Sequence, residues 1–562
     1  MRNPRTVHRL ITGVFLASLA GSAVFALSSS PKQPATPPPP TFGEQVDVRV
    51  VNVEVVVTDR HGLRVGGLAP ADFRLKVDGR AVPIDYFTEV RGGDAVAPIA
   101  AARHEVQGLP SVAPGSPVGT SYLVFLDDYF AFGPNRDEAL RNLKADLGRL
   151  GPEDRMAIVA YDGKHLEMLS SWTSSQAALG RAIDEAMRRP ALGLQRRGEL
   201  AAFQAIRGAG GRRGGGFRGG AFRGDRGLER LNTEELPFAK RLAEQVEGSV
   251  GAAVATMRSF ASPPGRKVML LLAGGWPYSP GDYVVDNANR PILEQDVPGG
   301  AALLAPLDDT ANLLGYTVYP VDVQGLQAEM AGADRRGPAP SGSFLVRPTE
   351  VRATLLTVAS ETGGQPILAG NHESPLAIAA ADTRSYYWIG FTPEFKRDDA
   401  RHKLKVEVAG PGLEVRAREN YLDLSRRGEA TMTVESAVLF GSPASDGRLP
   451  IEIGSPASSG WRQMDLPLTV AIPAADVTFV PLAGKYVGEL ELRVAALDKD
   501  GHRSDIPAMP FKLTLPERPE AGKFIRYETT VRLRKIDQRL TVAIVDPLSN
   551  RVLTASTEVK GI

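Results

Sequence analysis

Two adjacent carboxylates, Asp127 and Asp128, are the residues of this 562-residue chain best placed to do chemistry. They follow a short apolar run, residues 122–126, which reads YLVFL and is typical of a buried parallel strand. Because open α/β sheets bind ligands beyond the carboxyl ends of their strands, both side chains are expected at such an edge. Carboxylate oxygens there could help to hold a metal ion. The alternative is that they cap backbone N–H groups of the following loop and helix.

The sequence offers little for catalysis. Its seven histidines, among them His165, His372 and His402, are scattered and show no HExxH or His-x-His spacing. The chain has no Gly-x-Ser-x-Gly turn, no Gly-x-x-x-x-Gly-Lys phosphate loop and no cysteine for thiol chemistry. We therefore expect a protein that is not an enzyme. An acid/base pair of carboxylates brought together by folding would make an envelope hydrolase the alternative.

Strand and helix patterns alternate between residues 120 and 382, so the two carboxylates are expected on an α/β domain. Apolar strand patterns occur at residues 122–127, 154–161, 267–273 and 315–322, and helical spacing at residues 136–150, 176–188, 234–260 and 354–361. This alternation predicts a doubly wound, mostly parallel sheet with helices on both faces.

Three aromatic residues near the expected strand ends are candidate contacts for a partner protein. Tyr129 follows the two carboxylates, and Trp276 and Tyr278 follow the strand at residues 267–273. Aromatic side chains are favoured anchors in interfaces. The alternative for Trp276 and Tyr278 is packing within their own loop.

Period-2 patterns flank the α/β region on both sides. Residues 46–91 contain a strong alternation and a hairpin with Asp78-Gly79 at its turn. Residues 383–425 return to strand patterning and are expected to pair with 46–91, which would make the α/β domain an insertion. Residues 431–562 predict a further β-sandwich of the immunoglobulin-like type.

A Gly/Arg-rich stretch, residues 207–228, interrupts the α/β pattern. It contains too little apolar surface to order itself, so a disordered surface loop is expected. Its Arg-Gly-Phe repeats are similar to segments that bind single-stranded RNA, but the export signal described next argues against that function. We expect no nucleic-acid partner.

The N-terminus predicts export. Arginines precede an apolar segment that ends near residue 27, which has the form of a secretory signal peptide, residues 1–27. The alternative is a retained membrane anchor, since the apolar run is long enough to span. A proline-rich linker, residues 28–45, follows. The expected location is the periplasm, the cell surface or the medium.

The composition excludes no class of soluble partner. A net charge of +1 and a charged fraction of 23% point to neither nucleic acid nor an anionic membrane surface. With no cysteine, an exported chain has no disulfides and depends on its apolar cores.

The order of these motifs resembles the von Willebrand factor A (VWFA)-related domain proteins of the acidobacterial secreted type. The resemblance covers about residues 46–422 and is carried by VVNVEVVVTDRHGLRVGGLAPADFRLKVDGRAVPIDYF, YLVFLDD, EDRMAIVAYDG, RKVMLLLAGG, YTVYPVDVQGL, ASETGG and SYYWIGFTP running into RARENYL. It implies a VWA/Rossmann-like fold at residues 120–382, and adhesion or protein–protein contact rather than catalysis.

The resemblance also implies a metal-ion-dependent adhesion site, which this chain matches in part. Asp127 corresponds to the first aspartate of the family's Asp-x-Ser-x-Ser motif, but Tyr129 and Ala131 stand at the serine positions. The strand at 267–273 runs into Ala273-Gly274, where the family has Thr-Asp-Gly. Asp128 is an additional carboxylate, and Asp322 ends a nearby strand.

We therefore expect an exported adhesion or scaffold protein that binds a protein partner, with no cofactor. The alternative is Mg²⁺-dependent adhesion through a modified site at Asp127 and Asp128. Membrane association is expected only if the signal segment is retained.

Overall fold

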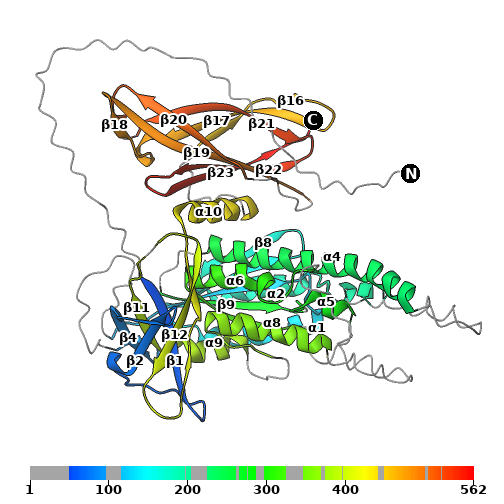
Figure 1. The fold of residues 1–562 in the computed structure, drawn as a ribbon, viewed down its shortest axis with the longest axis vertical. Coiled ribbons are helices and arrows are strands. Elements are labelled where there is room, and N and C mark those ends of the chain that lie inside the picture. The colour runs from blue at the N-terminus through cyan, green and yellow to red at the C-terminus, as the bar shows by residue number, and fades with distance from the viewer. Residues whose placement is uncertain are drawn as a thin grey trace, which may run out of the picture. The chain divides into compact units, whose positions relative to one another are not determined.

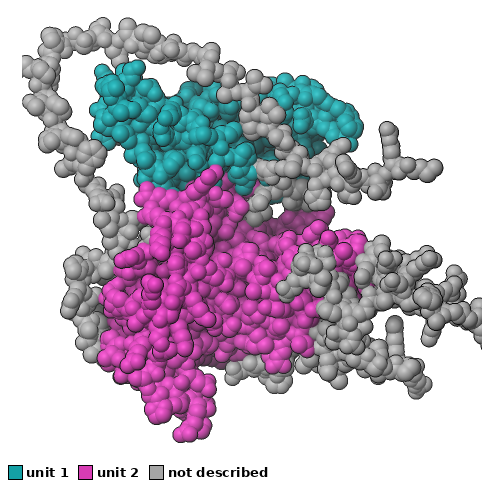
Figure 2. All heavy atoms as spheres, in the orientation of Figure 1, with its two compact units in different colours: residues 1–49, 441–562 teal, residues 50–440 magenta. Residues whose placement is uncertain are grey.

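The computed structural model describes residues 50–96, 115–196, 198–200, 202–203, 224–260, 265–274, 276–285, 297–323, 346–368, 374–394, 396–440, 449–499, 504, 506–520 and 522–562. The described residues form two compact units, one within Val50–Phe440 and one within Gly441–Ile562 (Figure 2). The predicted signal peptide and proline-rich linker, residues 1–45, lie outside the described residues, as do residues 207–223 of the Gly/Arg-rich stretch. No helix among the described residues is both long and apolar enough to cross a membrane.

A five-stranded sheet forms the centre of the larger unit. Its order is β10 (Tyr316–Asp322), β9 (Arg266–Ala273), β6 (Thr120–Asp127), β7 (Arg155–Tyr161) and β8 (Leu166–Thr173). All neighbours are parallel except β8, which pairs antiparallel with β7. The predicted α/β class with a mostly parallel sheet is confirmed. Asp127 ends the central strand, which is buried throughout.

Helices cover both faces of this sheet (Figure 1). On one face the core includes Leu123 and Phe125 of β6, and on the other it includes Val124 and Leu126, because successive side chains of a strand point to opposite faces. The first face is covered by α4 (Gly224–Ser259), α6 (Ala301–Leu314) and α8 (Val346–Thr362), with α5 (Pro280–Val285) nearby; the second is covered by α1 (Gly133–Ala145), α2 (Gln176–Arg188) and α9 (Pro375–Thr383). A short 3₁₀ helix, Leu147–Arg149, follows α1.

The α/β domain is inserted into a β-sandwich whose strands come from both of its flanks. One sheet has the order β13 (Leu413–Arg416), β1 (Val51–Asp59), β11 (Ser385–Phe391), β4 (Tyr86–Arg91) and β5 (Asp94–Ala95). The other has the order β14 (Asn420–Asp423), β12 (Ala400–Val408), β2 (Phe73–Val77) and β3 (Arg80–Val82). A 3₁₀ turn, Pro70–Asp72, precedes β2. Between the sheets, apolar side chains from both flanks form one core, including Val55, Leu75 and Ile389.

Asp382 joins the sandwich to the α/β domain within this unit. Its carboxylate lies at the end of α9, is 1% exposed, and accepts hydrogen bonds from Arg416 of β13 (2.6 Å) and the Tyr319 hydroxyl of β10 (2.8 Å). Arg64, which follows β1, donates to its other oxygen. Arg266 of β9 donates to its backbone carbonyl (3.0 Å). One carboxylate therefore receives bonds from three segments that are distant in sequence.

Two predicted boundaries are wrong. Residues 431–440 belong not to the C-terminal sandwich but to a helix, α10 (Arg426–Phe440), in the larger unit. The reason is the spacing of Ala430, Val434 and Val438, which buries one face of a helix. The Gly/Arg-rich stretch also ends earlier than predicted, since α4 begins at Gly224.

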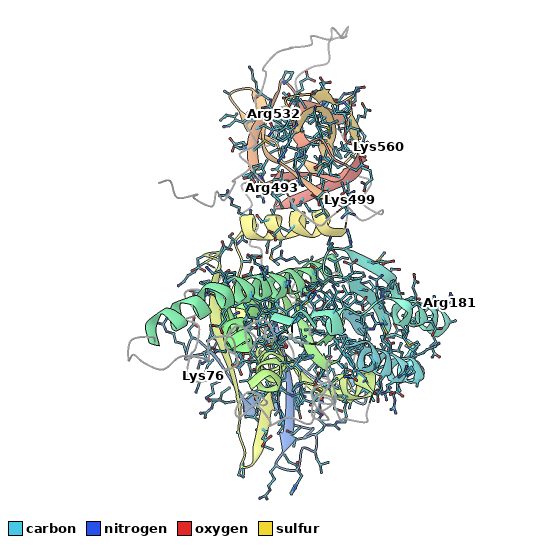
Figure 3. The ribbon with its side chains drawn as sticks, turned by 90° about the vertical axis from the view of Figure 1, so that its right-hand side faces the viewer. Lys76, Arg181, Arg493, Lys499, Arg532 and Lys560 are labelled. Carbon is cyan, nitrogen blue, oxygen red and sulfur yellow. The ribbon has the colours of Figure 1, made fainter. Side chains whose placement is uncertain are left out.

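The C-terminal unit is an antiparallel β-sandwich. Its first sheet contains β15 (Ile451–Ile453), β16 (Ala457–Ser458), β17 (Gln463–Pro473) and β21 (Phe524–Arg534); its second contains β18 (Val480–Leu482), β19 (Lys485–Asp498), β20 (Ala508–Leu515), β22 (Gln538–Asp546) and β23 (Arg551–Val559). A 3₁₀ turn, Ala474–Asp476, follows β17. The alternating residues of both sheets, such as Leu466 and Leu492, share one core. Figure 3 labels Arg532 of β21, which pairs with Asp465 of β17 across the first sheet (2.8 Å).

Candidate functional site

Asp127 is fully buried at the carboxyl end of β6. Its Oδ1 accepts hydrogen bonds from the backbone N–H groups of Tyr129 (3.1 Å) and Phe130 (3.3 Å). Its Oδ2 accepts from the indole Nε1 of Trp276 (2.5 Å), in the segment after β9. The carboxylate thus caps the turn after its own strand and holds the neighbouring strand's loop against it.

Burial raises the pKa of Asp127 to about 7. The hydrogen bond from Trp276, the nearby Ser249 hydroxyl and the two backbone N–H groups all favour the charged form, but they only partly offset the burial. The group therefore takes up its proton near neutral pH.

Stability of the larger unit is expected to fall as the pH rises from about 4 to about 7. An unfolded aspartate has a pKa of about 3.9, so in this interval the folded state holds a proton that the unfolded chain has lost. The stabilisation from this proton is complete below the pKa of the unfolded aspartate. It is lost as the pH rises through the pKa of the folded state, about 7. Thermal unfolding at pH 5 and pH 8 measures the effect.

Asp127→Asn is the control for this dependence, because asparagine does not titrate. Burial also raises the pKa of Asp128, although Arg189 and Arg136 oppose it, so the slope in the variant is expected to be reduced rather than abolished. Equal slopes in wild type and Asp127→Asn would contradict the assignment.

Asp128 is also fully buried, between two arginines. Its Oδ1 accepts from Arg136 of α1 (2.7 Å) and its Oδ2 from Arg189, just after α2 (2.7 Å). Arg136 is itself buried and donates to the carbonyl of Arg189 (2.9 Å). Asp128 therefore connects α1 and the C-terminal end of α2 to the end of the central strand.

The residues at this edge do not fit a Mg²⁺ site. All four oxygens of Asp127 and Asp128 accept hydrogen bonds from protein donors, and two of these donors are cationic guanidinium groups. A hard divalent cation needs several free oxygen ligands. Asp322 ends β10, which β9 separates from β6, so it does not join them. Asp127 caps backbone N–H groups of the following loop, as in the capping alternative, whereas Asp128 pairs with two arginines.

The three candidate contact aromatics lie in different surroundings. Trp276 is only 2% exposed, because its indole is packed inside and bonded to Asp127, so it offers no surface to a partner. Tyr278 is half-buried, with its ring packed over Gly300. Tyr129 is half-buried under the guanidinium of Arg196, whose Cζ lies 4.3 Å from the ring centroid.

A cavity of about 270 Å³ opens beside Tyr129 at the same edge of the sheet. Its apolar lining comes from Phe130, Leu200, Phe238, Leu242 and Tyr283. Polar side chains from the segment after α2 and from α4 also line it: Arg196, Glu199, Arg241 and Gln245. An apolar hollow with a few convergent polar groups is the usual form of a binding site.

The cavity carries an unbalanced positive charge. Arg196 pairs with Glu199 (3.0 Å). Arg241 is exposed, and its Cζ lies 5.5 Å from the centroid of the Phe238 ring. Within the described residues, no carboxylate pairs with Arg241. One guanidinium thus remains for an anionic group of a ligand.

A close backbone approach at Gly193 fixes one wall of the cavity. The N–H of Leu192 donates to the carbonyl of Asp128 (2.8 Å), and that of Gly193 to the carbonyl of Ala131 (3.0 Å). A Cβ atom at position 193 would lie 2.4 Å from the Phe130 carbonyl oxygen, so only glycine fits. The loop after Asp127 and the cavity wall are therefore one rigid structure.

Sequence reasoning predicted a site at the edge where this cavity opens, but it did not identify Arg196 and Arg241. Both lie in stretches that are rich in charged residues, where no spacing distinguishes a binding arginine from a solvated one. The predicted contact Tyr129 lies next to them.

Comparison with known proteins adds little. No family model and no curated protein matches the chain. Among solved structures, the crystal structure of the pilus adhesin SpaC from Lactobacillus rhamnosus GG matches with a TM-score of 0.20 and 10% identity. The alignment covers 88% of this chain and 61% of the adhesin. At this TM-score the match supports no argument about fold or function.

Proposed function

We propose that this chain is an exported adhesion or scaffold protein without enzymatic activity, whose α/β domain binds an acidic side chain of a partner protein without a metal. The binding site is the cavity beside Tyr129. The observation that carries the proposal is the exposed guanidinium of Arg241, which faces an apolar hollow and has no carboxylate partner among the described residues.

The chemistry of the cavity favours a carboxylate next to an apolar group. A guanidinium binds carboxylates through two parallel hydrogen bonds, and neighbouring rings such as Phe238 and Tyr283 exclude water from the contact. The lining of the cavity contains two arginines and one glutamate, so its net charge is positive. An aspartate or glutamate beside an aromatic or aliphatic residue matches both features.

The strand-end carboxylates support the metal-free form of this proposal. Every carboxylate oxygen of Asp127 and Asp128 already accepts a hydrogen bond from a protein donor. A calorimetric Mg²⁺ titration tests this point. Saturable binding that Asp127→Ala abolishes would favour metal-dependent adhesion instead.

Charge reversal at Arg241 tests the binding function. A library of random 12-residue peptides is selected on the immobilised full chain, and enriched peptides are measured by fluorescence anisotropy. We expect them to carry Asp or Glu beside an apolar residue. Arg241→Glu is expected to weaken binding at least tenfold, about 1.4 kcal/mol, with less effect at high salt.

Arg181→Glu is the matched control. Arg181 is an exposed arginine of α2, which covers the opposite face of the sheet from α4 (Figure 3). Its charge reversal changes the net charge by the same amount and is expected to leave the affinity within about twofold. Enrichment of peptides without acidic residues, or equal binding by both variants, would count against the proposal.

A further inference from the structure

A second cluster of polar side chains lies in the sandwich of the larger unit. Asp398 stands just before β12, His402 lies in β12, and Asp423 ends β14. One potential ligand atom of each residue lies within 4.8 Å of those of the other two. Neither the capping of β6 nor the cavity beside Tyr129 uses any of these residues.

Strand register brings the three residues together. In the antiparallel pair of β12 and β14, His402 stands opposite Tyr421 and Ala400 opposite Asp423. Because side chains alternate along a strand, His402, Tyr421 and Asp423 share one face, with His402 and Asp423 as diagonal neighbours. The Asp399 carboxylate fixes the loop that carries Asp398 by accepting from the backbone N–H of Ser425 (2.7 Å).

One buried oxygen of Asp423 has no partner among the described residues. The residue is 1% exposed, and its Oδ2 accepts from the backbone N–H groups of Lys396 (2.6 Å) and Arg397 (2.9 Å). Its Oδ1 is buried and has no hydrogen-bond partner in the part of the chain that the structure describes. A buried carboxylate oxygen left unpaired is costly, and an ion bound at that position removes the cost.

His402 is oriented as metal-binding histidines are. Its Nδ1 lies 2.7 Å from Oδ2 of Asp78. Since an ionised carboxylate only accepts, Nδ1 carries the hydrogen and Nε2 has the free lone pair. The ring stacks on Tyr421, with centroids 5.0 Å apart and 21° between the planes. A carboxylate behind a histidine in this way fixes the tautomer and raises the basicity of the ligand nitrogen.

The surrounding charges favour a cation. The carboxylates of Asp398 and Asp423 lie close to the His402 ring on one side, and that of Asp78 bonds its Nδ1. One imidazole therefore has three carboxylates beside it. Asp398 is exposed and, among the described residues, accepts only from the N–H of Ala400 (3.1 Å), so its other oxygen can turn toward a bound ion.

We propose that Asp398, His402 and Asp423 bind a Zn²⁺ ion, with Asp78 orienting His402 and water in the fourth position. One imidazole with two carboxylates suits zinc, whereas Ca²⁺ and Mg²⁺ prefer oxygen ligands alone. Ligand atoms of a tetrahedral zinc site lie about 3.3 Å apart, so closure needs a rotamer change of the exposed Asp398. The ion would link β12, β14 and the loop before β12.

Calorimetric titration of the full chain tests this site. The protein is first dialysed against EDTA, and ZnCl₂, MgCl₂ and CaCl₂ are titrated separately. We expect one zinc per chain with micromolar or tighter affinity, and at least tenfold weaker binding of the other two ions. Asp398→Asn is expected to weaken zinc binding at least tenfold, since the exposed side chain keeps its bond to Ala400 while losing its charge. His402→Gln is expected to abolish it.

His165→Gln is the matched control. His165 also lies beside a carboxylate, Asp162 (3.3 Å), but belongs to no cluster of three ligand residues within the described chain. The His165→Gln variant is expected to bind zinc as wild type does. Zinc is expected to raise the unfolding temperature of wild type and of His165→Gln, but not that of Asp398→Asn or His402→Gln. The absence of saturable zinc binding, or binding that survives both Asp398→Asn and His402→Gln, would overturn the proposal.

Discussion

Asp382→Ala is expected to destabilise the larger unit by about 3 kcal/mol. Removing the carboxylate leaves Arg416, Arg64 and the Tyr319 hydroxyl without their acceptor, and breaking a buried ion pair on one side costs about 3–5 kcal/mol. The side chains of Arg64 and Arg416 are 29% and 26% exposed, which places the effect at the lower end of that range. Burial, followed by repulsion from Arg416, already lowers the pKa of Arg64 to about 10.

Differential scanning calorimetry measures this effect. The transition of the larger unit should move to lower temperature, while that of the C-terminal sandwich stays in place. Asp184→Ala is the control, because Asp184 pairs with Lys144 on the surface (2.6 Å) with both side chains more than 40% exposed. Such a pair contributes at most about 1 kcal/mol. Equal shifts for the two variants would refute the role of Asp382.

Asp128→Ala is expected to cost about 3–5 kcal/mol. The substitution leaves the guanidinium of Arg136, 2% exposed, and that of Arg189, 15% exposed, without their shared carboxylate. The expected loss is large because Arg136 cannot reach solvent. Urea unfolding, followed by the fluorescence of the four tryptophans, measures the free energy change.

Asp137→Ala is the control for Asp128→Ala. Asp137 also binds Arg136 (2.8 Å), but its side chain is 28% exposed, and Asp128 remains as a partner. We expect its loss to cost about 1 kcal/mol. If millimolar Mg²⁺ restored the free energy of unfolding of the Asp128→Ala variant, this would contradict the structural role assigned to Asp128.

The fold class was predictable because its signals are local. The runs YLVFL and VMLLL are apolar without alternation, as expected for strands covered on both faces, and helical spacing lies between them. α10 was missed since its short apolar repeat, Ala430, Val434 and Val438, adjoins a long β region. In so short a stretch, only the spacing of the apolar residues distinguishes a helix from a strand.

The position of the candidate site could be predicted from the sequence, but the bonding of its side chains could not. Asp127 lies at the edge of the sheet where the cavity opens, because it ends the central strand. Whether its oxygens were free depended on Trp276, far away in sequence, which only the fold brings to it. Whether a carboxylate pairs with Arg241 likewise depends on the residues that folding places around it, and none of the described ones does. The convergence of His402 with Asp423 depends on the register between β12 and β14.

Because the α/β domain is inserted between β5 and β11, strands that pair in the sandwich are synthesised far apart in time. β1 leaves the ribosome first, yet it pairs with β11, as in Val51 opposite Phe391. At about 5–20 residues per second, this partner emerges tens of seconds later. Until then an apolar strand with Val53, Val55 and Val57 has unpaired edges, and such strands aggregate. We expect the nascent chain to need a chaperone that covers β1 until β11 has been made.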